Sequence, residues 1–220
     1  MDIEHELPQG PLIIPVRSPV GADLGTLWSL HASVPLTTDL IDDLTQWRNT
    51  NRQFFATHFN ATMERTLSWI NTVIIPDPTR LLFMIDTPDG THVGHLGVTS
   101  LNTSRPELDN MIRGRSAGGP KIMYWAEVAL VHWLFTQPQV LSVHLKVFSH
   151  NWIPISIHRS IGFTDHCVQR LVRRDVGGEI HLVPAADAVG ASDCTYLEMM
   201  VERQTFAHFY ELAFAKEVTG

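Results

Sequence analysis

The sequence has few of the features that mark a secreted or membrane protein. It contains only two cysteines, Cys167 and Cys194, in 220 residues, too few for the disulfide framework of a small secreted domain. It lacks the positively charged start and following apolar run of a signal peptide. No uncharged apolar run reaches the roughly 20 residues that cross a bilayer. We therefore expect a cytoplasmic protein without a membrane partner.

Basic residues are scarce as well. The chain has 16 Lys and Arg against 23 Asp and Glu, a net charge of −7. A general nucleic-acid binder needs a basic surface that displaces counterions from phosphates, so we expect no nucleic-acid partner. An anionic ligand would need a local basic pocket instead. With 44% hydrophobic and 18% charged residues, the composition is typical of one folded globular domain.

The twelve histidines do not have metal-site spacing. His92 and His95 are three apart on an expected strand, so their side chains point to opposite faces. No predicted helix carries two histidines four residues apart, and the sequence has no Walker loop and no Gly-x-Ser-x-Gly elbow. We expect no metal ligands, and neither a P-loop enzyme nor a serine hydrolase is supported.

Two helices are predicted near the start of the domain. The first runs from Thr38 to about Asn49, where apolar residues repeat at helical spacing. The second is capped by Thr62 and ends before Pro76. Its expected apolar stripe consists of Leu67, Ile70 and Ile74.

A hairpin, a third strand, a long apolar helix and a fourth strand follow. They are predicted at residues 80–86 with 92–101, 107–114, 122–135 and 141–148. Asp89-Gly90 supplies the turn of the hairpin, and the last of these strands alternates strictly between two faces. This order predicts an α+β (α/β layered) domain with a mixed, mostly antiparallel sheet of six to seven strands.

The stretch NWIPISIHRSIGF at residues 151–163 predicts a short helix. Asn151 is a strong N-cap residue, Pro154 lies in the first turn where no intrahelical N–H is lost, and Gly162 ends the helix in a left-handed conformation. The face expected to be buried consists of Ile153, Ile157 and Ile161. Beyond it we predict strands at 163–174 and 195–202 and a closing helix from Thr205 to Lys216.

The chain divides by composition into three segments of one domain. Residues 1–36, rich in Pro and Gly, form an N-terminal arm or edge strands. Residues 37–175 form the core, and residues 176–220 complete the domain with a strand and a helix. We expect the outer segments to shape a ligand pocket or the contact of a homodimer.

A Gly-rich loop precedes the apolar helix. Gly118, Gly119, Lys121 and Ile122 lead into the helix N-terminus, where free backbone N–H groups and the helix dipole favour an anion. Nearby arginines, Arg113 and Arg115, add charge of the right sign. The pattern indicates a site for a phosphate-bearing ligand, and the alternative is a plain strand-to-helix connection.

The order of elements and the motif Asn151-x2-Pro154-x3-His158-x3-Gly162-Phe163 resemble the Gcn5-related N-acetyltransferase (GNAT) superfamily over roughly residues 45 to 170. In that family the helix reads Asn-x2-Ala-x3-Tyr-x3-Gly-Phe. The segments Trp47-Arg48-Asn49 and Trp69-Ile70 resemble the branch of ribosomal-protein N-terminal and amino-sugar acetyltransferases. The resemblance implies a GNAT-like fold whose sheet is splayed at the cofactor cleft.

The same resemblance implies acetyl-CoA as co-substrate. The residues expected to hold it are Met111, Ile112, Arg113, Arg115, Gly118, Gly119, Lys121, Ile122, Met123 and Asn151. A backbone N–H of Met111 or Ile112 is expected to polarise the thioester carbonyl. Pro120 departs from the family loop, because it removes one donor N–H from the phosphate cradle.

Two side chains are expected to carry the chemistry. Glu107 stands where the family places a base for the amine, often acting through water, and Asp109 points to the same side of the strand. His158 replaces the tyrosine that protonates the leaving thiolate, and its unperturbed pKa is ~6.5 against ~10 for tyrosine. The alternatives are a solvated carboxylate at a strand end and a histidine half-buried on a helix flank.

The sequence therefore predicts an N-acetyltransferase that moves the acetyl group of acetyl-CoA directly to a primary amine. The expected acceptor is a small molecule such as an amino sugar or an amino-sugar nucleotide. Two alternatives stay open at this point. One is an enzyme that acetylates protein or peptide N-termini, and the other is an acyl-CoA-binding module without catalytic activity, which Pro120 and the missing tyrosine make plausible.

Overall fold

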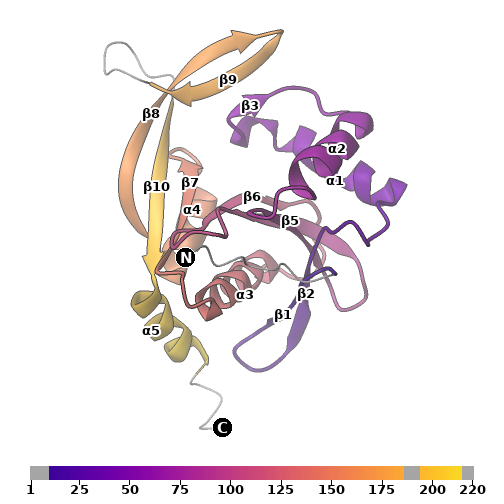
Figure 1. Ribbon diagram of the computed structural model, residues 1–220. Coiled ribbons are helices and arrows are strands. Elements are labelled where there is room, and N and C mark those ends of the chain that lie inside the picture. Colours follow the sequence, from indigo (N-terminus) through magenta and orange to yellow (C-terminus); the bar gives the residue numbers. More distant parts are fainter. Residues whose placement is uncertain (1–9, 186–193, 215–220) are drawn as a thin grey trace.

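One mixed sheet carries helices on both of its faces (Figure 1). In the computed structural model, which describes residues 10–185 and 194–214, ten strands join in the order β1-β2-β4-β5-β6-β7-β10-β8-β9-β3. Neighbouring strands are antiparallel except β6 and β7. The predicted α+β class with a mixed, mostly antiparallel sheet is confirmed. The strands are β1 (Ile13–Arg17), β2 (Asp23–Ser29), β3 (Thr57–His58), β4 (Leu81–Asp86), β5 (His92–Thr99), β6 (Glu107–Arg113), β7 (Ser142–Phe148), β8 (Thr164–Val176), β9 (Glu179–Pro184) and β10 (Cys194–Glu202).

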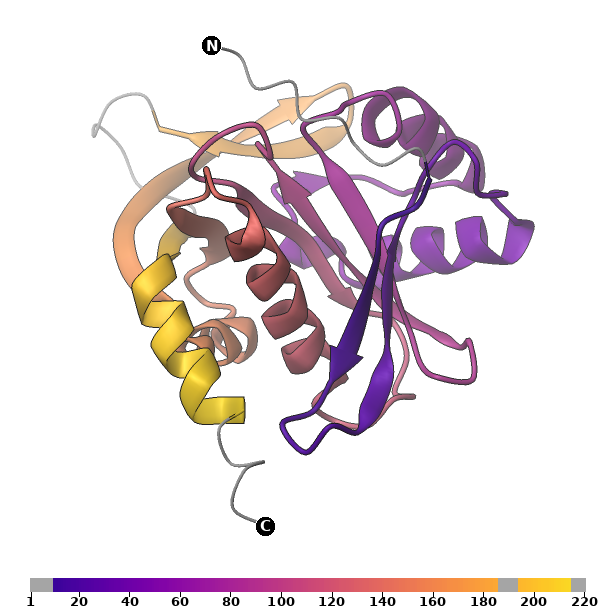
Figure 2. The same cartoon turned by 60° about the horizontal axis from the view of Figure 1, so that its bottom comes forward.

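The helices divide between the two faces of the sheet. On one face, α1 (Thr38–Thr50) and α2 (Met63–Trp69) pack over Leu82, Met84 and Ile112. On the other face lies α3 (Ile122–Thr136), whose apolar residues form the main core together with residues of α4 (Trp152–Ile161) and α5 (Arg203–Phe214). Figure 2 shows α3 in front of the sheet with α5 beside it. Within the described residues, no helix is long and apolar enough to span a membrane.

The strands β6 and β7 separate in the middle of the sheet. They pair at only two positions, Glu107 with His144 and Leu108 with Leu145. Both strands continue beyond these pairs, β6 to Arg113 and β7 to Phe148, without bonding to each other. The sheet is therefore splayed at this point, as the resemblance implies, and the separation leaves room for a ligand between two central strands.

The second helix differs from its prediction in one respect. Thr62 caps it as predicted, by accepting a hydrogen bond from the Arg65 N–H, but Leu67 is 39% exposed while Ile70 and Ile74 are buried. A π-helical segment at Ile70–Ile74 follows α2. A π-helical turn holds more residues than an α-helical turn, so it rotates Ile70 and Ile74 relative to Leu67. The regular α-helical spacing used for the prediction therefore placed Leu67 on the wrong face.

The buried face of α4 differs from the expected one at Ile153, whereas Ile161 is buried as expected and Ile157 packs against the core. Ile153 is 56% exposed, whereas Ile155, His158 and Ile161 are buried. Gly162 ends the helix with φ of 105°, as predicted. Asn151 occupies the N-cap position, but its side chain makes no capping hydrogen bond, so the expected side-chain cap is wrong and the amide is left for other contacts.

Two further strands, β3 and β9, were not predicted, and the sheet exceeds six to seven strands partly for this reason. The hairpin of β8 and β9 turns at Gly177-Gly178 and arches over the molecule (Figure 1). At its end, β9 pairs with β3, which belongs to the connection between α1 and α2. An ion pair between Arg65 and Glu179 joins the same two regions. The predicted end of α5 at Lys216 lies outside the described residues.

Candidate active site

A cleft of about 1200 Å³ opens where β6 and β7 separate. It has two sides that we name by their residues. The loop side is lined by Lys121 and Met123 at the start of α3 and by Asn151 before α4. The arginine side is lined by residues from the end of α1 to β3 and by one tyrosine of β10. Its main residues are Arg48, Phe55, Thr57 and Tyr196.

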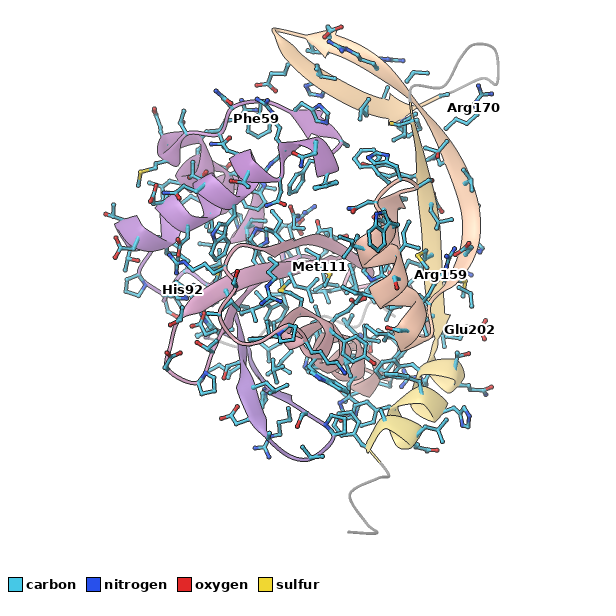
Figure 3. The ribbon with its side chains drawn as sticks, turned by 180° about the vertical axis from the view of Figure 1, so that it is seen from behind. Phe59, His92, Met111, Arg159, Arg170 and Glu202 are labelled. Atoms are coloured by element: carbon cyan, nitrogen blue, oxygen red, sulfur yellow. The ribbon has the colours of Figure 1, made fainter. Side chains whose placement is uncertain are left out.

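The structure brings most of the predicted site residues to this cleft, but not all of them. Those that line it are Glu107, Met111, Ile112, Arg113, Lys121, Met123, Asn151 and His158. Those that do not line it are Arg115, Gly118, Gly119 and Ile122. Figure 3 shows Met111 near the centre of the molecule, between the α1–α2 region and α4.

The loop side has the features of an anion site. Gly118 and Gly119 both have φ of 76°, a backbone conformation that glycine adopts without strain. Lys121 is the N-cap residue of α3, makes no side-chain cap, and is followed by a first turn without acidic residues. The first backbone N–H groups of α3 are therefore uncapped beside a lysine, which suits the pyrophosphate of coenzyme A.

The two arginines of the loop are already engaged. The Arg113 guanidinium donates to five backbone carbonyls of the loop, including those of Arg115 at 3.0 Å and Gly119 at 2.9 Å. Arg115 does not line the cleft; it donates to Asp43 of α1 at 2.5 Å and lies over the Trp47 ring. Both side chains hold the loop in shape, which is a different contact from the direct cofactor binding that the sequence suggested.

A bulge lies in the part of β6 that faces the cleft. One residue of β5, Leu96, stands opposite two residues of β6, Asn110 and Met111. Asn110 has φ of 50°. Among the described strands, β6 has no partner on its β7 side beyond Leu108. Successive N–H groups of a strand point to opposite sides, so one of Met111 and Ile112 offers its backbone N–H to a ligand carbonyl there.

Two carboxylates of β6 line the cleft. Glu107 accepts a hydrogen bond from Lys146 Nζ at 2.8 Å, and Asp109 forms an ion pair with Arg80 at 3.2 Å. Burial raises the pKa of Asp109 to about 6, although the Arg80 charge acts in the opposite direction. Gly97 makes room for this side chain, because a Cβ there would lie 2.1 Å from Asp109 Oδ1. Asp109 thus changes its charge closer to neutral pH than a free aspartate.

His158 is more deeply buried than either reading of the sequence suggested. Its side chain is 7% exposed, and its Nδ1 lies 2.6 Å from Oε1 of Glu127, a fully buried carboxylate of α3. Because Glu127 occupies Nδ1, the nitrogen left for the cleft is Nε2. A neutral ring then offers a lone pair at Nε2, and a protonated ring offers an N–H.

Sequence reasoning missed Glu127, Arg48 and Tyr196 as members of the site. For Glu127 a signal was available, because a lone carboxylate in an apolar helix needs a buried partner. For Arg48 the sequence offers only its place in the family motif Trp47-Arg48-Asn49, which does not indicate that it faces a ligand. Tyr196 gave no signal, since the pairing of β10 with β7 places it beside Phe148. Burial raises its pKa to about 12, so its hydroxyl stays protonated at neutral pH.

Comparison with known proteins bears on this geometry. The family model described as "Acetyltransferase (GNAT) domain" matches residues 34–164. No curated protein matches the chain. Among solved structures, the spermidine N-acetyltransferase of Vibrio cholerae in complex with CoA and spermine is 12% identical, with a TM-score of 0.61 over 79% of this chain and 96% of that one.

Two further solved structures come from the branch that the sequence resembles. RimJ of Mycobacterium smegmatis in complex with CoA-disulfide is 14% identical, with a TM-score of 0.61 over 93% of this chain and 97% of that one. RimL, a ribosomal L7/L12 α-N-protein acetyltransferase, is 13% identical, with a TM-score of 0.58 over 89% and 98%. At these identities the likeness concerns the fold. Since the family model spans more than half of the sequence and the cleft has the expected loop and splayed strands, this chain belongs to the GNAT family of acetyl-CoA-dependent acetyltransferases.

Proposed function

We propose that this enzyme transfers the acetyl group of acetyl-CoA directly to the primary amine of a small molecule, such as an amino sugar or an amino-sugar nucleotide. The observation that carries the proposal is the single cleft in which an uncapped helix N-terminus, two carboxylates and a buried histidine meet. Acetyl-CoA supplies the activated acetyl group when bound. Lys121, the first N–H groups of α3 and Asn151 are the groups that would hold it, with the loop kept in shape by Arg113.

A carboxylate of β6 is proposed to take the proton of the amine. Glu107 is the residue that the resemblance indicates, and it is held by Lys146. Asp109 is the stronger candidate by its electrostatics, because a base with a pKa of about 6 is closer to the operating pH than an ordinary carboxylate. Either carboxylate acts on an amine bound beside it on β6.

His158 is proposed to return a proton to the leaving thiolate. The N–H at Nε2 is the donor, and Glu127 stabilises the protonated ring through Nδ1. Glu127 is thus a positioning residue that fixes the orientation of the ring. The short distance between Nδ1 and the Glu127 carboxylate keeps Nε2 as the nitrogen that faces the cleft. A histidine in place of the family's tyrosine can therefore still protonate the leaving thiolate, because Glu127 holds the ring and stabilises its protonated form.

The covered arginine side favours a small acceptor. The β8–β9 hairpin pairs with β3 and is joined to α2 by Arg65 and Glu179. This bridge narrows access for a folded protein surface. A second candidate function is the acetylation of peptide N-termini, which the fold likeness to RimL and RimJ keeps in view, since an extended N-terminus is slender enough to enter.

The experiment has a binding step and a turnover step. Acetyl-CoA at a hundredfold its Kd should add about 2.7 kcal/mol to the free energy of unfolding and raise the Tm. Release of coenzyme A thiol is then measured with amino sugars, amino-sugar nucleotides, other small amines and short peptides. The proposal is wrong if peptides alone are acetylated, and the assigned activity fails if acetyl-CoA binds but no amine releases thiol.

A further inference from the structure

A half-buried guanidinium faces the arginine side of the cleft. Arg48, in the last turn of α1, lines the cleft with Phe55 and Thr57. Among the described residues, no carboxylate lies within ion-pair distance of Arg48. A cation removed from water without a counter-ion is unfavourable, so its retention in a ligand cleft calls for an explanation.

The guanidinium is fixed in place but not saturated with hydrogen bonds. Its carbon lies 3.6 Å from the centroid of the Phe55 ring and 4.7 Å from that of Phe59. One terminal nitrogen donates to the Thr57 carbonyl at 2.6 Å. The other, Nη1, is buried and has no partner within the described part of the chain. A rigidly held donor with free hydrogens is pre-organised for an acceptor of negative charge.

The surroundings add positive charge in a protein that is acidic as a whole. Arg52 and Arg65 are close enough to lower the pKa of Arg48, and burial is the larger cause of its fall to about 10. Arg48 therefore stays charged at neutral pH. Arg65 is paired with Glu179, and Arg52 donates to the Asn60 amide, so neither neutralises the site. Figure 3 shows Phe59 at the end of the α1–α2 region that faces the hairpin.

We infer that Arg48 binds a carboxylate or phosphate group of the acceptor, so that the acceptor is an amine that also carries an anion. The inference rests on the proposed function and narrows it. The amine end would lie near the carboxylates Glu107 and Asp109, and the anionic end near Arg48. Such opposite charges orient the acceptor along the cleft. Amino acids, short peptides with a free carboxylate and phosphorylated amino sugars have this chemistry, whereas a polyamine does not.

The test uses matched acceptors that differ only in the anion. Phenylalanine is compared with phenylalanine amide, and glucosamine 6-phosphate with glucosamine, so one pair probes a carboxylate and the other a phosphate. In the wild type we expect kcat/KM of the anionic member to exceed that of its neutral partner by about tenfold to a hundredfold in at least one pair. Arg48→Gln should remove this preference, and lower kcat/KM of the neutral member much less.

Two controls make the result specific. Arg52→Gln removes a neighbouring exposed cation and should keep the preference, and Arg48→Lys keeps the charge and should retain part of it. The inference is overturned if neutral members react as well as anionic ones in the wild type. It is also overturned if Arg48→Gln lowers both members equally or weakens acetyl-CoA binding instead.

A binding measurement separates this inference from the proposed function. Calorimetry of the CoA-loaded protein with the same four amines reports charge preference without turnover. If no amine is acetylated but anionic members bind better and lose this advantage in Arg48→Gln, the inference stands while the activity fails. If amines are acetylated without any charge preference, the proposed function stands and the inference about Arg48 fails.

Discussion

The loop side and the arginine side of the cleft differ in how the chain builds them. The loop side comes from a nearly continuous segment, from β6 through the Gly-rich loop and α3 to α4. The arginine side combines Arg48 and Thr57 with Tyr196 and a covering hairpin at β9. A site formed by one segment leaves a motif in the sequence, whereas a site assembled from distant segments does not.

Substitutions on the two sides of the cleft are expected to have different effects. Changes on the loop side should affect binding of acetyl-CoA or turnover with every acceptor. Changes on the arginine side should alter the choice among acceptors. A loop-side substitution that altered only the choice of acceptor, or an arginine-side substitution that weakened acetyl-CoA binding, would contradict the assignment of the two sides.

The largest effect is expected at the buried pair formed by Glu127 of α3 and His158 of α4. His158→Phe should lower kcat about a hundredfold with all acceptors, because a general acid contributes at least this factor. Glu127→Gln should lower kcat less than His158→Phe does, because the imidazole is kept but loses the carboxylate that orients it through Nδ1. The measurement is kcat of each variant with a saturating acceptor.

The control for this pair is Arg159→Gln on the same helix. Arg159 is paired with Asp165 on the protein surface, so Arg159→Gln should leave kcat unchanged. A kcat that is the same in wild type, His158→Phe and Glu127→Gln would remove the pair from the mechanism.

A somewhat smaller effect is expected at Asp109 of β6, which lines the cleft. Asp109→Asn should lower kcat/KM by about tenfold or more, since a positioned base is lost. Because burial raises the pKa of Asp109 to about 6, the wild-type carboxylate is protonated below that pH and ionised above it. Activity should therefore fall below about pH 6 in the wild type, and this acidic limb should disappear in Asp109→Asn. Glu107→Gln separates the two carboxylates, because a limb lost there instead would make Glu107 the base.

Next in size is the effect of loosening the loop. Arg113→Lys should raise the Kd for acetyl-CoA by about tenfold, because one ammonium group cannot satisfy the five carbonyls that the guanidinium holds. Relative rates among acceptors should not change. Calorimetric titration with acetyl-CoA checks this, and Arg105→Lys on an exposed turn serves as the matched control. An unchanged Kd would show that the loop keeps its shape without Arg113.

The smallest effect concerns the bridge over the arginine side. Glu179→Gln breaks a pair with Arg65 that lies at the surface, so KM for the acceptor should change by no more than about fivefold. Asp175→Asn lies on the same hairpin but pairs with Arg173 within β8, and it should have no effect. A change in acetyl-CoA binding in Glu179→Gln would mean that the bridge also serves the loop side.

Local patterns were sufficient for most elements of the core. The apolar periodicity predicted α1, the Thr62 cap predicted the start of α2, and the Asp89-Gly90 turn predicted the hairpin of β4 and β5. The predicted buried face of α4 was confirmed at Ile161 but wrong at Ile153, which is exposed while His158 is buried against Glu127. Such a pair depends on two helices meeting, which the periodicity of either helix alone does not contain.

By itself, the sequence determined the fold class, the Gly-rich loop before α3 and the place of His158 in a helix with a left-handed end. These depend on residues close together in the chain, where spacing and backbone preference act directly. Only the tertiary structure decided that Arg113 and Arg115 hold the loop and that Asp109 is buried enough for a raised pKa. It also decided that Arg48 lines the cleft with a nitrogen that has no partner among the described residues. These properties come from burial and charge contributed by distant segments, and they arise only when the chain is folded.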